Sequence, residues 1–496
     1  MKNKVVKLIF FLSVVSMLGS CEDYLTVLPE NNQSVYEFWR TKEEVESVLG
    51  AGYVKLRDAQ EMLFLLGEAR GNGLFFQNEV TELQREAQKV RRMDILATNE
   101  LARWDKLYAV INMANSVIRF GPDVVQRDES FNENVMKSFL SEAYFQRSLA
   151  YFYLVRSWGK VPFVKIPYVD DEAGYALPAS EPGEILQACV ADLQVALESA
   201  KSHFPETNVD NPLNTKGRAT RWAILALMAD IQLWLGNYDA VIASCEEIIN
   251  SNRVGLIGKE MWFNNFFPGN SNESIFEIQY SYALGQTNSY ISWFDTNTMY
   301  LISPYAQSLF AADDVRGLNG SYDAGGKLWK YIGINKSTKR NSSLQNDQNF
   351  ILYRLADIYL MEAEAYAMKA ADAPGDPNLD KSLELVNAVR TRAGIEPSAG
   401  SSDRLGMIQA ILQEREREFL AEGKNWFDIL RVANRDVPGF RELALTEVLQ
   451  VVSAGNQAMV RAKLADPNAW YLPVHFDELS VNTFLEQNPF YENLGN

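Results

Sequence analysis

The feature that most constrains the fold of this chain is a succession of long amphipathic segments that come in pairs. Apolar residues recur in these segments at the spacing of one helix face, and Gly or Pro stands at several of the breaks between them. The predicted helices are 41–55, 101–120, 135–158, 184–202, 220–235, 238–250, 350–369, 379–393 and 403–420. This pattern predicts an all-α fold, because helices that are apolar on one face must bury it against each other.

Two neighbouring segments, 220–235 and 238–250, are predicted to form a helical hairpin. Ala223, Ala226 and Ala229 are small enough to let a partner helix approach closely. The Gly-x-Tyr break at Gly236 is similar to that of a tetratricopeptide repeat. Later pairs would continue the stack at irregular periods, so we expect a degenerate tetratricopeptide-like scaffold, which would be rigid.

Helical periodicity is lost between residues 251 and 349, where Gly, Asn, Ser and aromatic residues dominate. A second irregular stretch covers residues 67–89. Long insertions of this kind in a rigid scaffold are commonly functional. We therefore expect a single domain over 21–496, made of a helical part (21–250), a loop-rich aromatic insertion (251–349) and a C-terminal helical part (350–496).

The first residues are similar to a lipoprotein export signal. Three lysines precede an apolar run over residues 8–18, which is shorter than the roughly 20 residues that a membrane-spanning helix needs. The run ends in Leu18-Gly19-Ser20-Cys21, which resembles a lipobox. We expect residues 1–20 to be removed and Cys21 to carry acyl chains that anchor the protein. The alternative is an ordinary signal peptide with a chance cysteine.

The balance of charge argues against nucleic acid as a partner. The chain has 47 Lys and Arg against 64 Asp and Glu, so its formal net charge of −17 would repel a phosphate backbone. Besides Cys21 it contains Cys189 and Cys245, each in a predicted helix, for which we expect buried free thiols, with a disulfide as the alternative. No Cys and His spacing typical of zinc occurs, so we expect no cofactor and no metal, although a structural ion stays an open question.

Motifs typical of catalysis are missing from the sequence. No GxSxG, HExxH or Gly-rich phosphate loop occurs, and His203 and His475 stand far apart. Glu414 and Glu418 lie four residues apart on one predicted helix, where salt bridges in a packed seam are expected instead of a catalytic pair. Structural ion pairs are likewise expected for Arg354, Asp357, Glu362 and Arg390. We therefore expect the chain not to be an enzyme.

Five segments, in this order and spacing, resemble the SusD/RagB family over nearly the whole chain. They run over residues 21–39, 141–162, 216–220, 354–394 and 414–431. Their characteristic pieces include Cys21-Glu22-Asp23-Tyr24-Leu25, Gly159-Lys160-Val161-Pro162, Lys216-Gly217-Arg218-Ala219-Thr220 and Trp426-Phe427-Asp428-Ile429-Leu430-Arg431, with Leu472-Pro473-Val474 and Gln487-Asn488-Pro489 near the end. One departure is Asn425, where the family usually has Arg, and this puts one local ion pair in doubt.

The resemblance implies a SusD-like lipoprotein of the cell outer membrane, anchored at Cys21. It implies two partners, an oligosaccharide or polysaccharide and a SusC-like TonB-dependent transporter that receives it. Glu22 and Asp23 are similar to a signal for export to the extracellular surface. The alternatives are a RagB-like subunit for peptide uptake and a glycoside hydrolase. The sequence does not identify the sugar, its linkage or its chain length.

Seven residues of the two irregular stretches are candidates for the ligand site. Aromatic rings pack on the C–H face of a sugar, while amides, Arg and carboxylates bond its hydroxyls. We expect the sugar to lie between the two stretches. The candidates are Glu68, Arg70 and Asn72 from the first, and Tyr282, Tyr290, Trp293 and Trp329 from the second. For the aromatic candidates, as for Trp262, Phe266 and Phe267, the alternative is a place in the core.

Overall fold

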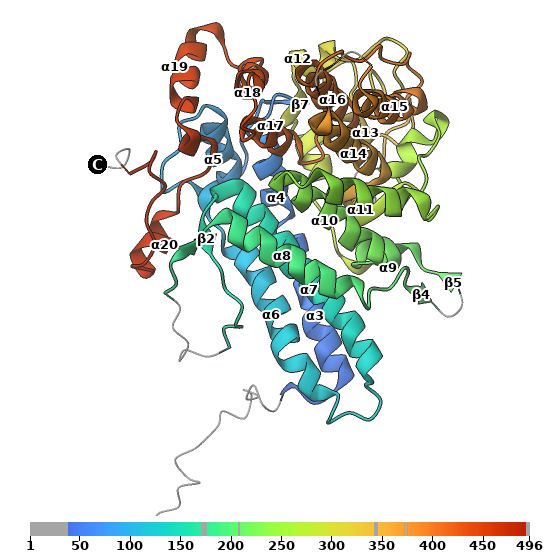
Figure 1. Ribbon diagram of the computed structural model, residues 1–496, viewed down its shortest axis with the longest axis vertical. Coiled ribbons are helices and arrows are strands. Elements are labelled where there is room, and N and C mark those ends of the chain that lie inside the picture. Colours follow the sequence, from blue (N-terminus) through green and yellow to red (C-terminus); the bar gives the residue numbers. More distant parts are fainter. Residues whose placement is uncertain are drawn as a thin grey trace, which may run out of the picture.

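The computed structural model describes residues 38–169, 176–206, 209–341, 346–371, 373 and 375–492, and the fold is mainly helical as predicted (Figure 1). The expected signal peptide and Cys21 lie outside these residues. The helices of the first half are α3 (Lys42–Asp58), α4 (Gln60–Glu68), α5 (Glu82–Arg91), α6 (Asp105–Val124), α7 (Glu133–Trp158), α8 (Pro182–Leu197), α9 (Pro212–Gly217), α10 (Arg221–Leu235) and α11 (Tyr238–Asn250). Those of the second half are α12 (Pro304–Ser308), α13 (Trp329–Ile332), α14 (Leu355–Lys369), α15 (Pro377–Arg392), α16 (Arg404–Phe419), α17 (Asn425–Ala433), α18 (Phe440–Leu449), α19 (Ala454–Leu464) and α20 (Phe476–Val481).

The strands are short and pair two by two into antiparallel sheets. Their pairs are β1 (Leu74–Phe76) with β7 (Tyr300–Ile302), β2 (Val161–Pro162) with β3 (Ala179–Ser180), β4 (Pro205–Glu206) with β5 (Val209–Asp210), and β6 (Ser274–Ile278) with β8 (Phe350–Arg354). Shorter helical turns are η2 (Glu100–Ala102), η3 (Lys259–Asn265), η4 (Tyr282–Leu284), η5 (Ser292–Thr296) and η6 (Pro467–Trp470). Two of these sheets, β1–β7 and β6–β8, connect the aromatic insertion to other parts of the chain.

Helix ends follow local signals that the sequence carries. Thr41 caps α3 by accepting a hydrogen bond from the Glu44 backbone N–H. The Glu44 carboxylate in turn accepts a hydrogen bond from the Thr41 backbone N–H. Gly236 ends α10 in the left-handed conformation (φ 82°), which costs glycine little. The chain then reverses directly into α11, so the predicted hairpin is confirmed.

Helices α3, α6 and α7 pack side by side and extend below the rest of the molecule in Figure 1. A separate apolar cluster that includes Trp39, Val117 and Phe139 fills the lower part of this three-helix projection. α3 runs upward from there and is followed, after Ala59, by α4. Its upper end therefore carries the chain from the projection into the main body.

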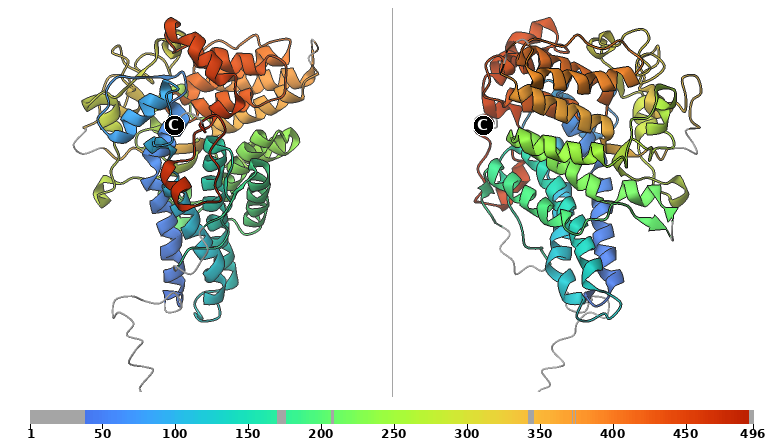
Figure 2. Two further views of the ribbon diagram at one scale, coloured as in Figure 1. Left: turned by 90° about the vertical axis from the view of Figure 1, so that its left-hand side faces the viewer. Right: turned by 45° about the vertical axis from the view of Figure 1, so that its right-hand side comes forward.

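The remaining long helices form stacked antiparallel pairs above the projection (Figure 2). α8 packs on α7 and α10, α11 packs on α10 and α14, and α14 packs on α15 and α16. This succession is the helical-pair scaffold that the sequence predicts. Cys189 in α8 and Cys245 in α11 are buried free thiols, which excludes the alternative of a disulfide between them.

Several segments differ from the predictions. The first five residues of the predicted helix 350–369 form β8, whose side chains are all buried. A short, mostly apolar run can be strand or helix, and its periodicity does not decide which. Residues 82–91 form α5 within a stretch that we predicted to be irregular, because Thr81 and Gln84 make a capping box. The predicted helix 184–202 ends at Leu197.

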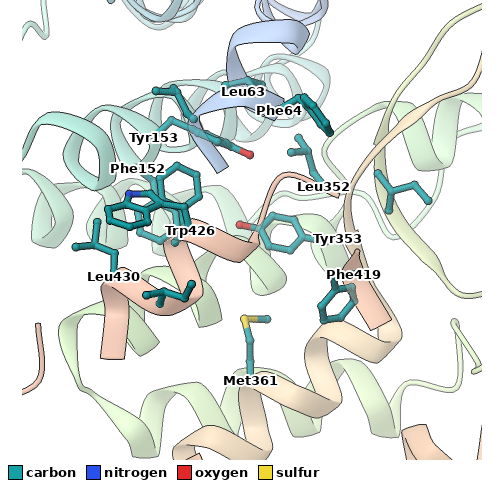
Figure 3. Packing of buried hydrophobic residues seen from close by; sticks show 14 of the residues in the cluster. Leu63, Phe64, Phe152, Tyr153, Leu352, Tyr353, Met361, Phe419, Trp426 and Leu430 are labelled. Atoms are coloured by element: carbon teal, nitrogen blue, oxygen red, sulfur yellow. The ribbon is translucent and has the colours of Figure 1, made fainter. Parts of the chain in front are cut away.

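One large apolar cluster joins the two halves of the chain, and Figure 3 shows its centre. Helices α4 and α7 from the first half meet β8, α14, α16 and α17 from the second half there. Its labelled side chains are Leu63, Phe64, Phe152, Tyr153, Leu352, Tyr353, Met361, Phe419, Trp426 and Leu430. Burial of this much apolar surface is the main favourable contribution to folding.

Beside this core lies a fully buried ionic network centred on Arg354 at the end of β8. The five N–H groups of its guanidinium all donate hydrogen bonds, to the carboxylates of Glu273, Glu418 and Glu422 and to the carbonyl of Glu418. Burial raises the pKa of Glu422, but Arg354 and Lys330 outweigh burial and hold that pKa below its usual value. The predicted role of this segment as a packed ionic seam is confirmed.

The ionic network extends along α16. Arg316, also fully buried, bonds Glu414 and Glu418 at 2.7 and 2.8 Å, and Arg390 pairs with Glu414 at 3.1 Å. Asp357 accepts from Arg415, at 2.8 Å, and from Lys424 at 2.5 Å. The structural ion pairs expected for Arg354, Asp357 and Arg390 therefore form. Glu362 differs: it is buried, and its Oε2 has no partner among the described residues.

The end of α4 and the residues that follow it interlock with the turn after α16. A Cβ on Gly67 would lie 1.9 Å from the Gly423 carbonyl oxygen, so only glycine fits there. The Glu68 carboxylate accepts hydrogen bonds from the backbone N–H groups of Gly423 and Lys424, at 2.8 and 3.3 Å. Its Oε2 is buried without a partner among the described residues, and burial raises the pKa of Glu68 to about 8, against the effect of these bonds.

Arg70 and Asn72 complete the interlock. The guanidinium of Arg70 lies 4.1 Å above the Trp426 ring, which stacks on Trp470 with centroids 5.5 Å apart. Asn72 donates from its backbone N–H to Asn425 Oδ1 at 2.7 Å, and Asn425 in turn donates to the Glu416 carboxylate. A neutral amide thus bonds Glu416 at the position where the family usually has Arg.

Glu68→Gln tests the energetics of the interlock. The folded-state pKa of Glu68, about 8, lies above the ordinary 4.5, so the native state binds this proton more tightly than the unfolded state. The contribution of Glu68 to stability is therefore full below about pH 4.5 and is lost as pH rises to about 8. Because Gln mimics the protonated carboxyl, the variant should gain stability over the parent between pH 5 and pH 8, by up to about 4 kcal/mol.

Chemical denaturation at pH 5 and pH 8 measures this difference. The matched control is Glu129→Gln, which changes an exposed carboxylate on the turn between α6 and α7 and should follow the parent at both pH values. Equal pH dependence for Glu68→Gln and the parent would contradict the assignment of a buried proton to Glu68.

Candidate ligand-binding site

A pocket of about 390 Å³ opens where the junction of α3 and α4 faces the aromatic insertion. The junction provides charged and amide side chains, and the insertion provides a polar loop with aromatic residues at both ends. The residues that line it are Arg57, Asp58, Gln60, Glu61, Tyr280, Gly285, Gln286, Thr287, Asn288, Ser289 and Trp293. We call it the Tyr280 pocket.

The junction wall is fixed by the break between two helices. α3 ends at Asp58, Ala59 is fully buried, and α4 begins at Gln60. The Gln60 amide donates to the Tyr290 hydroxyl at 3.1 Å, in the core behind the pocket. The break exposes Asp58 and leaves Arg57 and Glu61 half-buried, so three charged side chains border one opening.

The opposite wall is a loop held by its backbone. Tyr280 donates from its N–H to Asn349 at 3.0 Å, and Tyr282 donates from its N–H to Asp347 at 3.0 Å. Ser281 and Gln286 exchange backbone hydrogen bonds, at 3.0 and 2.9 Å, and Gly285 makes the turn in the left-handed conformation (φ 68°). Tyr282, in this turn between the lining residues Tyr280 and Gly285, is 42% exposed.

The pocket offers many hydrogen-bonding groups and a modest apolar surface. Arg57 donates, Asp58 and Glu61 accept, and the amides and hydroxyls of the loop do both. Burial raises the pKa of Glu61, while a hydrogen bond from Gln84 and the charge of Lys106 oppose this. The arrangement suits a polar, uncharged ligand with many hydroxyl groups and an apolar face.

Two of the predicted site residues have a different place from the one expected. Tyr290 and Trp293 are 0% and 1% exposed. Trp293 stacks on Phe64 with centroids 5.1 Å apart, and Tyr290 packs on Tyr331 at 4.7 Å. Trp293 borders the pocket but is almost fully buried. These rings fill the core beneath the insertion, so their faces are not open to a sugar.

The other predicted residues are also distributed differently. Glu68, Arg70 and Asn72 are buried in the interlock and do not line the Tyr280 pocket. Trp329 is half-buried, donates from Nε1 to the Asn335 carbonyl at 2.8 Å and lies outside the pocket lining. Tyr282 is the predicted aromatic residue that is exposed, and it lies in the chain between two lining residues, Tyr280 and Gly285.

The sequence analysis missed the residues of the α3–α4 junction. Arg57, Asp58, Gln60 and Glu61 follow a helix that we predicted to end at residue 55, and they carry no motif. The signal that could have located them is the sharp change from the amphipathic α3 to the almost wholly buried α4, which occurs at Ala59.

Two further features of the described residues bear on function. They contain no group of three or more His, Cys, Asp and Glu side chains placed to hold a metal ion. None of their helices combines the length and the apolar character needed to span a lipid bilayer.

Two family models match the chain. One, described as the SusD family, covers residues 310–491, and the other, described as starch-binding associating with outer membrane, covers residues 23–233. Among curated proteins, SusD-like protein P38 of Formosa agariphila is 26% identical over 97% of this chain and 98% of its own length.

Solved structures share the fold. A laminarin-binding SusD-like protein superposes with a TM-score of 0.67 at 20% identity, covering 91% of this chain and 99% of its own. Surface glycan-binding protein A from Bacteroides uniformis gives a TM-score of 0.71 at 20% identity, covering 91% of this chain and 100% of its own. The order of helices, the matched family models and these relatives agree: the chain belongs to the SusD/RagB family.

Proposed function

We propose that this protein captures oligosaccharides or polysaccharides at the cell surface in the Tyr280 pocket and delivers them to a SusC-like TonB-dependent transporter. The observation that carries the proposal is the combination of an exposed Tyr282 ring with a wall of hydroxyl-bonding groups on a rigid scaffold. Names of relatives, one laminarin-binding and one surface glycan-binding, support the same class of ligand.

The geometry gives each group a part in binding. The Tyr282 ring would pack on the C–H face of a sugar at the rim, a contact of about 1 kcal/mol beyond the area it buries. Arg57 would donate to ring or hydroxyl oxygens, and Asp58 and Glu61 would accept from hydroxyl groups. Gln286 and Asn288 can do both from the facing loop.

We propose that the bound glycan is not cleaved. A glycosidase places two carboxyl groups on either side of the scissile bond. Asp58 and Glu61 both come from the α3–α4 junction and so stand on the same wall of the pocket, where the facing loop from Gly285 to Ser289 contributes amides and hydroxyls but no carboxylate. This arrangement favours binding over hydrolysis.

Tyr282→Ala should weaken binding of a retained polysaccharide about fivefold, the loss expected for one stacked ring. Affinity electrophoresis against laminarin, amylopectin, xylan and pectin identifies that polysaccharide, and calorimetric titration measures the loss. Phe484→Ala, which removes an exposed ring (62%) outside the linings of the described pockets, is the control and should bind like the parent.

Trp293→Ala separates this result from a structural effect. Because Trp293 is a core residue, its removal should destabilise the fold by about 3–5 kcal/mol, whereas Tyr282→Ala should leave the melting temperature nearly unchanged. Unaltered affinity of Tyr282→Ala would place the ligand elsewhere. Retention of cationic peptides, but of no polysaccharide, would favour peptide uptake instead.

Cys21→Ala should release the protein from the membrane without changing its fold. Acyl chains on Cys21 would be the anchor, since no helix among the described residues could span the bilayer. Fractionation of cells that express the variant measures the effect. If Cys21→Ala protein still sediments with washed outer membranes, the prediction of a lipid anchor at Cys21 is wrong. The proposed glycan site does not depend on that result.

A further inference from the structure

A second pocket, of about 400 Å³, lies next to the first, on the neighbouring face of α4. Met62 and Leu83 give it an apolar side, and Glu82, Asp105 and Lys106 stand on its polar side. Met62 is buried and Leu83 half-buried, so this surface is part of a packed wall and not a mobile loop. We call it the Leu83 pocket.

Glu61 stands between the two pockets. It lines the Tyr280 pocket, and the next residue, Met62, lines the Leu83 pocket. Its Oε1 accepts a hydrogen bond from Gln84 Nε2 at 3.1 Å, which ties α4 to α5. Lys106 lines the Leu83 pocket, and its charge partly opposes the rise that burial causes in the pKa of Glu61. Glu61 and Gln84, which lie between the pockets, are therefore polar and hydrogen-bonded to each other.

We propose that the two pockets form one trough, and that the Leu83 pocket holds additional sugar units of a chain whose first units occupy the Tyr280 pocket. This inference rests on the proposed function. It specifies the ligand class further: an oligosaccharide long enough to pass Glu61, and not a mono- or disaccharide.

The chemistry of the Leu83 pocket matches this use. Leu83, which is half-buried, provides an apolar surface for the C–H face of a sugar, although without a flat ring, while Met62 is only 3% exposed. Glu82 and Asp105 accept from hydroxyl groups and Lys106 donates to oxygens. Arg103 is already engaged, with Glu100 at 2.9 Å and Asp477 at 2.6 Å, and so forms a fixed edge. Charges of both signs line the pocket, which favours a neutral chain over a strongly ionic one.

The double variant Glu82→Ala with Lys106→Ala tests the inference. It removes one charge of each sign, so net charge is unchanged, and both side chains are at least partly exposed. The ligands are the disaccharide and the hexasaccharide of whichever polysaccharide among laminarin, amylopectin, xylan and pectin the parent retains. Glu129→Ala with Lys137→Ala, on exposed positions near the turn between α6 and α7, is the charge-matched control.

We expect the parent to bind the hexasaccharide about tenfold more tightly than the disaccharide, and the pocket variant to keep only a roughly twofold preference. The ratio of the two affinities is the readout, because the charge of Lys106 also acts on Glu61 and its removal shifts the affinity for both lengths together. Equal affinity of the parent for both lengths, or a preference that the variant retains, would overturn the inference and leave the proposed function standing. Retention of no polysaccharide at all would overturn both.

Discussion

The guanidinium of Arg354 is bonded to carboxylates from the loop before β6, from α16 and from the turn after α16. A buried charge of this kind is tolerated only when its partners are complete, and loss of one partner typically costs about 3–5 kcal/mol. The seam therefore fixes where β8 lies relative to α16. Glu68 and Gly67 then dock on the turn at Gly423, which brings the first half of the chain against the second.

Both walls of the candidate site are held by the ionic network at Arg354 and by the docking of Glu68 on the turn at Gly423. α4, which carries Gln60 and Glu61, continues directly into Gly67 and Glu68 of the interlock. The facing loop is hydrogen-bonded to Asp347 and Asn349, which lie just before β8. The same seam thus holds the two sides of the Tyr280 pocket at a set separation. A ligand that needs several simultaneous hydrogen bonds gains from such a preformed site, because little ordering remains to be done on binding.

Much of the fold could be predicted because helix signals are local. Thr41, Gly159 and Gly236 mark helix ends by backbone chemistry that does not depend on tertiary contacts. The role of Glu414 and Glu418 was also predictable, since charges of both signs at helical spacing favour ion pairs. β8 was not, because its apolar run obtains its strand partner, β6, from a distant part of the chain.

The candidate site was harder to predict, because residue type does not reveal burial. Tyr290 and Trp293 have the composition of a sugar platform, yet they pack under the insertion, while Tyr282 in the same insertion is exposed. Glu68, Arg70 and Asn72 are polar residues in a Gly-rich stretch, which is equally typical of a binding loop and of a close backbone contact. Only the position of the 416–425 segment distinguishes the two, and no local pattern encodes it.

Hydrogen–deuterium exchange of the whole protein, with and without the retained polysaccharide, tests most directly whether the ligand binds at the α3–α4 junction. It also tests whether the conformation of the ionic network behind that junction stays unchanged on binding. The account predicts slower exchange in residues 57–61 and 280–290, and unchanged exchange in residues 349–356 and 414–424. Protection confined to another face of the molecule, or altered exchange across the seam on binding, would contradict it.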